Sequence, residues 1–168
     1  ADILRMFDTA FEHLMPSDLR LYPEDLAAAI DALTPRLYDL LNNGVYKAGF
    51  ASSQPAYEEA LEGVFAMLDE LEERLTGDYL FGDSVTETDI RAFVTLIRFD
   101  AAYHGLFKTN RRQVKDYPRL TDYITRMLDL PGVRETVNMD HILHGYYSIK
   151  ALNPNGIVPK APDHIAEL

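Results

Sequence analysis

Apolar residues recur every three or four positions through most of this chain, and strand-like alternation of apolar and polar residues never lasts. That period places the apolar side chains on one face of an α-helix. The helices that it predicts cover residues 2–15, 23–42, 54–76, 86–103, a segment from about 117, a short turn near 131 and residues 139–147. From residue 149 the chain is rich in Pro and Asn and should form an extended C-terminal tail. The pattern therefore predicts an all-α fold.

Prolines and glycines refine the ends of these helices. Pro16 should end the first helix. The apolar face of that helix consists of Ile3, Phe7, Ala10, Phe11 and Leu14. Pro35 should kink or restart the second helix, with Thr34 as a possible cap. The Asn-Asn-Gly sequence at 42–44 indicates a turn, and Gly77 suits the C-terminal stop of the third helix.

The helix predicted over 86–103 is apolar nearly all round, which is typical of a helix buried at the centre of a bundle. Thr86 and Asp89 have the spacing of a capping box, in which each side chain bonds the backbone N–H of the other residue. Val85 and Ile90 flank them as the matching hydrophobic staple. Because this pattern satisfies donors at a helix end, we interpret the four residues as structural.

Charged residues on and near this helix should also be structural. Arg91 and Arg98 lie two helical turns apart, near Asp89 and Asp100. Buried charges need partners, so we expect ion pairs here, either within this domain or at an interface with another domain or subunit, and Arg98→Met should lower the stability of the fold. The carboxylates within residues 58–73 lie opposite an apolar stripe and are interpreted as a solvated face.

The composition argues against several functions. The net charge is −11 and the pI is near 4.8, so we expect no binding to a nucleic acid. The chain has one short basic patch, which consists of Lys108, Arg111, Arg112 and Lys115. We interpret this patch as a solvated loop, and an anion site is the alternative. No apolar run of about 18 residues and no leader are visible, so we expect a cytoplasmic protein without membrane contact.

The chain contains no cysteine, which rules out disulfides, thiolate metal sites and thiol nucleophiles within it. His141 and His144 stand three apart beside Asp140, but a zinc site needs a third ligand and an open position. We therefore expect no bound metal. At 168 residues the chain is one domain or one part of a longer protein.

Five segments together resemble one protein family. They are NNGVYKAGFA at 42–51, YLFGDSVTETDIRAFVTLIRFDAAYHGLFKTN at 79–110, DYPRLTDYI at 116–124, PGVRETVNMDHI at 131–142 and GYYSIKALNPNGIVP at 145–159. In this order they are similar to the glutathionyl-hydroquinone reductases, the Xi class of glutathione S-transferases. The capping box and staple also resemble those at the central helix of glutathione transferase C-terminal domains.

The resemblance implies a glutathione S-transferase C-terminal-like helical bundle that occupies residues 1–168 as a single domain. It also implies that a thioredoxin-like N-terminal domain is absent from this chain. In the family that domain binds glutathione and carries a cysteine, whose thiolate removes glutathione from a glutathionyl-hydroquinone. We therefore expect no catalytic residue here and no activity from this chain alone. A homodimer is also implied.

The resemblance assigns contact with the aromatic quinol to Tyr46 in GVYK and Tyr147 in GYY. A phenol suits that substrate because its hydroxyl can donate to a quinone oxygen while its ring packs on the substrate. Tyr103, His144 and Tyr146 are expected as further neighbours of the pocket. The alternative is a non-catalytic interaction module of the same fold, in which these tyrosines are only packed. An upstream thioredoxin-like segment with a cysteine would favour the enzyme.

Overall fold

A computed structural model describes residues 2–11, 13–14 and 19–166 of the chain. Its α-helices are α1 (Asp2–Thr9), α2 (Ala27–Leu37), α3 (Gly44–Gly49), α4 (Gln54–Arg74), α5 (Glu87–Arg98), α6 (His104–Leu106), α7 (Pro118–Asp129), α8 (Met139–Tyr147) and α9 (Asp163–Ala166). Two π-helices, η1 (Tyr38–Asn42) and η2 (Phe99–Tyr103), and two 3₁₀ turns, η3 (Val114–Asp116) and η4 (Arg134–Thr136), complete the order. Within the described residues the only β pairing is one bridge between Tyr79 and Gly82. The predicted all-α class is confirmed.

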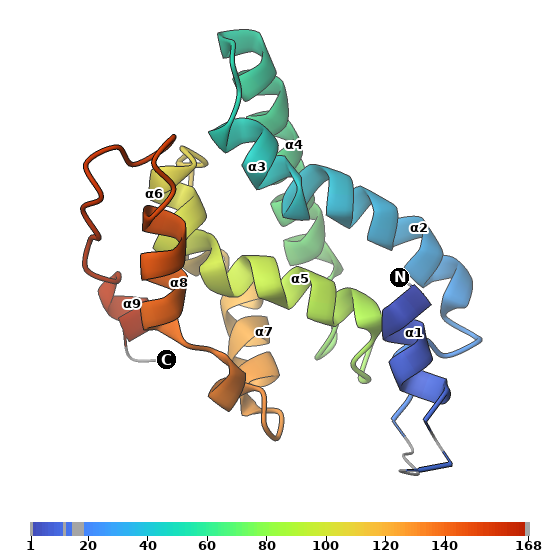
Figure 1. Ribbon diagram of the computed structural model, residues 1–168. Coiled ribbons are helices and arrows are strands. Elements are labelled where there is room, and N and C mark those ends of the chain that lie inside the picture. Colours follow the sequence, from blue (N-terminus) through green and yellow to red (C-terminus); the bar gives the residue numbers. More distant parts are fainter. Residues whose placement is uncertain (1, 12, 15–18, 167–168) are drawn as a thin grey trace.

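The central helix of the bundle is α5, which runs between α2 and α3 on one side and α7 and α8 on the other (Figure 1). Its buried side chains include Ala92, Phe93, Leu96 and Ile97. They join one apolar core with residues of α2, α4, η2 and α7, such as Leu37, Phe65, Phe99 and Tyr123. The predicted burial of the central helix is therefore confirmed. No described helix has the length and apolarity needed to cross a bilayer.

Asp89 organises the beginning of α5. Its carboxylate accepts hydrogen bonds from the Thr86 N–H at 2.8 Å, the Thr86 hydroxyl at 2.7 Å and the Leu80 N–H at 3.0 Å. Thr86 and Asp89 form the predicted capping box. Burial raises the pKa of Asp89, and these hydrogen bonds oppose that rise. Val85 and Ile90, the predicted staple, are both partly buried, and Val85 packs against the core.

Two helix ends differ from the prediction. α2 begins at Ala27 and not at residue 23, because a turn over residues 23–26 precedes it. α4 ends at Arg74 without a left-handed glycine, so the predicted role of Gly77 is wrong. A Cβ atom at Gly77 would lie 3.2 Å from the carbonyl oxygen of Gly82. Gly77 therefore allows two backbone segments to approach each other, and Gly82 is the residue with a positive φ of 111°.

The predicted restart at Pro35 does not occur, and the alternative of a kink there stays a prediction. α2 continues through Pro35 to Leu37. The hydroxyl of Thr34 caps no restarted helix but forms a 3.0 Å hydrogen bond with the hydroxyl of Thr88 on α5. Leu33 and Leu37 are buried in the core, and this packing keeps the segment helical although Pro35 has no N–H to donate.

The predicted turn at residues 42–44 is a continuation of the helical path. η1 ends at Asn42, Asn43 has helical dihedral angles, and α3 begins at Gly44. The side chain of Asn42 donates to the Arg91 carbonyl oxygen at 2.8 Å and also bonds Thr95, so it binds η1 to α5. The chain therefore turns without leaving helical geometry and places α3 against the central helix.

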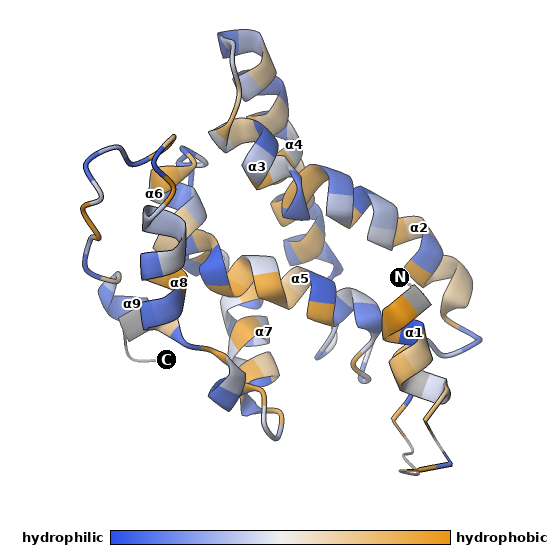
Figure 2. Cartoon of the chain, viewed as in Figure 1, coloured by the Kyte–Doolittle hydropathy of each residue, from blue (hydrophilic) through white to orange (hydrophobic). Residues whose placement is uncertain are grey.

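α1 is shorter than predicted and leaves its apolar face uncovered. It ends at Thr9, and Pro16 lies outside the described residues. Ile3 and Phe7 are each 70% exposed, and Leu14 is 71% exposed. Figure 2 shows this apolar segment at the edge of the molecule.

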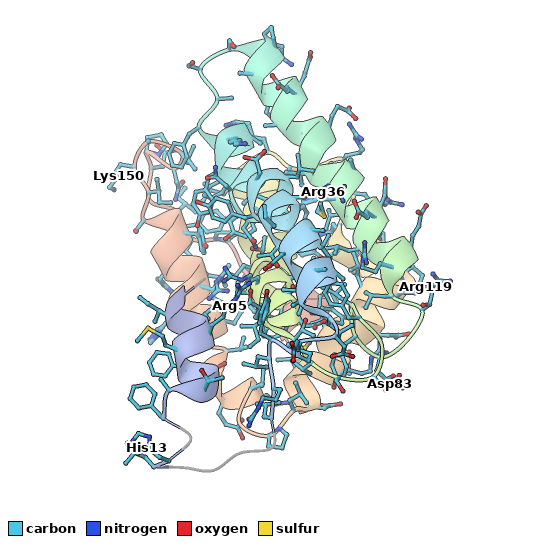
Figure 3. The ribbon with its side chains drawn as sticks, turned by 90° about the vertical axis from the view of Figure 1, so that its right-hand side faces the viewer. Arg5, His13, Arg36, Asp83, Arg119 and Lys150 are labelled. Carbon is cyan, nitrogen blue, oxygen red and sulfur yellow. The ribbon has the colours of Figure 1, made fainter. Side chains whose placement is uncertain are left out.

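Polar contacts hold α1 on the bundle. The guanidinium of Arg5 donates to Asp31 at 2.7 Å and to the buried carboxylate of Glu87 at 3.1 Å. It also lies 3.7 Å from the centre of the Tyr22 ring, which is a cation–π contact. In Figure 3 Arg5 lies on the side of α1 that faces the other helices. The hydrogen bond from Arg5 lowers the pKa of Asp31.

The expected ion pairs on α5 are only partly present. Arg91 lies 3.9 Å from Glu87, whereas Arg98 forms no ion pair with a described carboxylate and donates to the Val94 carbonyl oxygen. Asp100 turns away from Arg98, because it accepts hydrogen bonds from the backbone of η3 at 2.7 and 3.1 Å. His164 at the end of the tail also bonds Asp100, at 2.9 Å. Arg98 therefore has no ion pair within the described residues, and its pairing at an interface with another domain or subunit stays a prediction.

The short basic patch lies against the acidic face of α4. Arg111 pairs with Glu62, and Arg112 pairs with Asp69. Arg112 also covers the ring of Tyr117 at 3.6 Å. These two cations therefore have partners within the protein, which weakens the alternative of an anion site.

Candidate functional site

Three tyrosines from three distant segments meet beside the central helix. Tyr46 comes from α3, Tyr103 from η2 and Tyr146 from α8. Their hydroxyl oxygens are 3.0 Å apart between Tyr46 and Tyr146, 2.5 Å between Tyr103 and Tyr146, and 3.5 Å between Tyr46 and Tyr103. We call these residues the tyrosine triad. Hydrogen bonds weaken with distance, so the 3.5 Å contact between Tyr46 and Tyr103 is the weakest of the three.

The rings of the tyrosine triad are held by edge-to-face packing. Phe107 contacts Tyr46 and Tyr103 with ring centres 5.2 Å apart and Tyr146 at 5.8 Å. Such contacts prefer the tilted geometry seen here. Gly49 is required beside them, because a Cβ atom at that position would lie 2.3 Å from the Phe107 ring. The packing therefore fixes the direction in which the hydroxyls point.

Burial differs across the tyrosine triad. Tyr103 is only 3% exposed, whereas Tyr46 is 36% exposed and forms the open edge. Burial, followed by the hydrogen bond with Tyr146, raises the pKa of Tyr103 well above its ordinary value. Burial also raises the pKa of Tyr146, to about 12. The phenols of Tyr103 and Tyr146 therefore stay protonated at neutral pH and can donate to an oxygen of a ligand.

Two neighbouring cavities border the tyrosine triad. The first, about 430 Å³, lies between α5 and α8; we call it the α8 cavity. Its wall is largely apolar and includes Phe93, Ile97, Ile142 and Ile149. The second, about 400 Å³, lies along η1 and α5; we call it the Arg91 cavity. Both are lined by Tyr46, Val94, Arg98 and Tyr146, so they are adjacent and together make up the candidate site for an aromatic ligand.

Local structure explains how the tyrosines are placed. The π-helix η1 precedes α3, the helix that carries Tyr46, and the π-helix η2 ends at Tyr103. π-helical turns are rare and occur frequently at functional sites. α8 begins at the Asn138 cap, whose side chain accepts a hydrogen bond from the His141 N–H at 2.9 Å. This cap fixes the start of α8, the helix that carries Tyr146.

The structure brings together only some of the residues that the sequence assigned to the substrate. Tyr46, Tyr103 and Tyr146 meet, whereas Tyr147 lines neither cavity and packs in a second apolar cluster with Ala101. Burial raises the pKa of Tyr147 as well. A role for Tyr147 in substrate contact stays a prediction, and the geometry favours Tyr146.

His144 is also outside the cavities. Its Nδ1 atom lies 3.0 Å from a carboxylate oxygen of Asp140 at the surface. Its neighbour His141 does line the α8 cavity, which the sequence reasoning missed. Among the described residues, no group of three His, Asp or Glu side chains could hold a metal ion.

The helical period contained a signal for these missed assignments. His141, Gly145 and Ile149 recur at four-residue spacing, and Ile142 with Tyr146 completes the same face of α8. Tyr147 falls on another face. The helical period does not tell which face of α8 lines the cavity, because only packing against α5 decides which face is covered.

Comparison with known proteins gives consistent matches. The glutathione S-transferase C-terminal domain family matches residues 54–126. The glutathionyl-hydroquinone reductase PcpF of Sphingobium chlorophenolicum is 46% identical over 166 residues, which cover 96% of this chain and 52% of the relative. Glutathione transferase Xi 1 from Trametes versicolor has a TM-score of 0.92 at 47% identity, and the match covers 96% of this chain and 58% of that protein.

A third match includes a ligand. The glutathione-bound structure of YqjG, a glutathione transferase homologue from Escherichia coli K-12, has a TM-score of 0.92 at 46% identity. The match covers 95% of this chain and 53% of that protein. The chain therefore spans about half the length of the relatives that it matches.

Proposed function

Because this chain carries the C-terminal domain of the glutathione S-transferase family and resembles its Xi class, we propose that it is the helical half of a glutathione-dependent reductase. The proposed substrate is a glutathionyl-hydroquinone, the class named for the relative PcpF. The observation that supports this most directly is the tyrosine triad, whose three hydroxyls converge where two cavities meet.

The proposed chemistry needs a thiolate from outside this chain, because the chain has no cysteine. That thiolate attacks the glutathionyl sulfur, and a cysteine–glutathione disulfide forms. The ring reacts as its keto tautomer, in which the sulfur-bearing carbon has already taken up a proton, so the electron pair of the broken carbon–sulfur bond passes into the ring and leaves negative charge on the ring oxygen. Protonation of that oxygen yields the free hydroquinone. A second glutathione then reduces the disulfide, and oxidised glutathione leaves.

The role proposed for this chain is to orient the aromatic ring and stabilise charge on its oxygen. Of the three protons of the tyrosine triad, two serve the hydrogen bonds at 2.5 and 3.0 Å, so one is left to donate to that oxygen as negative charge develops on it. A ligand oxygen can replace the weak 3.5 Å contact between Tyr46 and Tyr103 without breaking the shorter bonds. The apolar wall of the α8 cavity then packs on the ring.

We propose that glutathione and the cysteine belong to a thioredoxin-like domain that precedes this chain in a longer protein. The exposed apolar face of α1 supports this, because the helical bundle leaves Ile3 and Phe7 exposed and another domain can cover them. α1 contacts the bundle through Arg5, on its polar side. This arrangement suits a helix between two domains. A homodimer is also proposed, by resemblance to the family.

The test of the proposed function compares two adjacent tyrosines in the full-length protein. Tyr146→Phe should lower kcat/KM for a glutathionyl-hydroquinone by about tenfold or more, because one hydrogen bond to the developing charge is lost. Tyr147→Phe should stay within about twofold of the parent, because Tyr147 lines neither cavity. Steady-state turnover of glutathionyl-menadiol with glutathione measures both.

The opposite ranking of the two variants would assign the substrate to Tyr147 and remove the tyrosine triad from the mechanism. Absence of turnover in the full-length parent would favour the interaction-module alternative. The 168-residue chain alone should show no turnover, since it supplies no thiol.

A further inference from the structure

The charge of the two cavities is opposite to that of the protein. The chain has 27 acidic residues against 16 Lys and Arg. Yet no Asp or Glu is among the described residues that line the α8 cavity or the Arg91 cavity. Arg98 lines both, Arg91 lines one, and His141 lines the other. By comparison, the cavity between α3 and α4 is lined by Asp39 and Glu59 together with Lys47.

The two arginines are less well paired than other cations of this structure, since Arg91 has only the 3.9 Å contact with Glu87. Arg98 forms no ion pair with a described carboxylate, and its recorded hydrogen bond goes to a backbone carbonyl. In Arg91 the buried Nε and Nη2 atoms have no hydrogen-bond partner among the described residues. By contrast, Arg36, Arg111 and Arg112 each pair with a carboxylate of α4. Because these Arg91 atoms are buried, Arg98 is the cation whose donors are available to a ligand in the cavities.

We propose that Arg98 recognises a carboxylate on the substrate ring. This proposal rests on the proposed function for the aromatic nature of the ligand. The site then has three parts. The tyrosine triad binds a ring oxygen, Phe93 and Ile97 pack on the ring, and Arg98 pairs with the acidic substituent, with Arg91 adding positive potential. Arg98 also lowers the pKa of Tyr146 electrostatically, against the larger effect of burial, so its charge acts at the tyrosine triad.

This assignment defines a class of preferred substrates, namely hydroquinones with a carboxylate on the ring. A neutral ring would leave Arg98 without an acidic partner, whereas a carboxylate would form a charge-assisted hydrogen bond with it. A carboxylate of the glutathionyl group is the other source of the same chemistry. The experiment below separates the two sources.

The test uses the full-length protein with its glutathione site saturated by glutathione, under anaerobic conditions. Isothermal titration calorimetry measures the binding of 2,5-dihydroxybenzoate and of its neutral analogue 2,5-dihydroxybenzamide. The parent should bind the benzoate about tenfold more tightly, and Arg98→Gln should remove that preference by weakening only the benzoate. Arg98→Lys should retain part of it. Arg36→Gln, which removes a paired surface charge, should leave both affinities unchanged.

Equal affinity of the parent for the two probes would overturn the inference, as would a preference that persists in Arg98→Gln. If Arg98→Gln weakens the binding of glutathione and the parent does not prefer the benzoate, Arg98 recognises a carboxylate of the glutathionyl group. The inference is then also wrong. Unchanged affinity of Arg98→Gln for the benzamide shows that the variant is folded. Turnover of a conjugate is not part of this readout, so a benzoate preference would stand even if the proposed reaction failed.

Discussion

At the scale of single residues, Asp89 shows how one buried carboxylate determines the beginning of a helix. It is 0% exposed and accepts hydrogen bonds from Thr86 and Leu80. The hydroxyl of Tyr123 on α7 donates to the Asp89 backbone carbonyl at 2.9 Å. The residue therefore binds together the incoming loop, α5 and α7. Asparagine at this position would place an NH₂ group where Asp89 has a carboxylate oxygen. At least one of the donors on Thr86 and Leu80 would then lose its acceptor.

Asp89→Asn should lower the free energy of unfolding by about 2–3 kcal/mol, because a buried donor loses its acceptor. The loss should occur although the change removes a buried charge. Urea denaturation followed by circular dichroism measures it. Asp83→Asn, in the exposed approach to the same helix, is the matched control and should change stability by less than about 0.5 kcal/mol. Equal effects of the two variants would contradict the role given to Asp89.

At the scale of elements, α1 is the helix whose packing the bundle leaves incomplete. Its amphipathic pattern has the period of an ordinary core-facing helix, and yet its apolar side chains are exposed. Arg5 satisfies the polar side through Glu87, which is itself 2% exposed. α8 shows the opposite case, because both its apolar faces are used, one in the α8 cavity and the other in the cluster with Ala101. The same helical pattern thus has different partners in different elements.

Phe7→Ser should have different effects in the chain and in the full-length protein. In the 168-residue chain it should change stability by less than about 0.5 kcal/mol, because the ring is already 70% exposed. In the full-length protein it should cost about 2 kcal/mol, the value of burying an aromatic ring against another domain. Ile157→Ser, at an equally exposed position of the tail, should be neutral in both. Equal urea midpoints of the parent and Phe7→Ser in the full-length protein would exclude the proposed domain contact.

At the scale of the whole molecule, the packing of phenols makes stability depend on alkaline pH. Burial raises the pKa of Tyr117 and Tyr146 to about 12, and it raises those of Tyr103 and Tyr123 above the ordinary value of 10.0. Tyr117 directly precedes α7, Tyr123 lies in α7, Tyr146 in α8 and Tyr103 in η2. The stability of much of the bundle therefore depends on the pH. The folded state retains their protons longer than the unfolded state does.

The stabilisation from these phenols should be fully present below pH 10 and should be lost as pH rises toward about 12. Absorbance at 295 nm reports tyrosinate, and circular dichroism at 222 nm reports helix. We expect part of the tyrosinate signal to appear only as helix is lost. In Tyr146→Phe the decline of unfolding free energy between pH 10 and pH 12 should be shallower. Titration of all ten tyrosines near pH 10 with helix retained would contradict this prediction.

The sequence by itself determined the class of fold and the position of its central helix. The three- and four-residue period, the capping box at Thr86 and Asp89, and Pro118 in the first turn of α7 act within a few residues of their own position. They are therefore readable without the rest of the chain. Local signals were misleading at Pro35 and Gly77, where buried neighbours and a close backbone contact override the usual preference of the residue.

Only the tertiary structure decided the site. Tyr46, Tyr103 and Tyr146 are separated by 57 and 43 positions, and nothing local to any of them specifies that their hydroxyls meet. The choice between Tyr146 and Tyr147 depends on the rotation of α8, which is set by its packing on α5 and η2. The missing partner of Arg98 likewise follows from Asp100, whose carboxylate is occupied by the backbone of η3. Helix formation is local, whereas the convergence of side chains is the result of long-range packing.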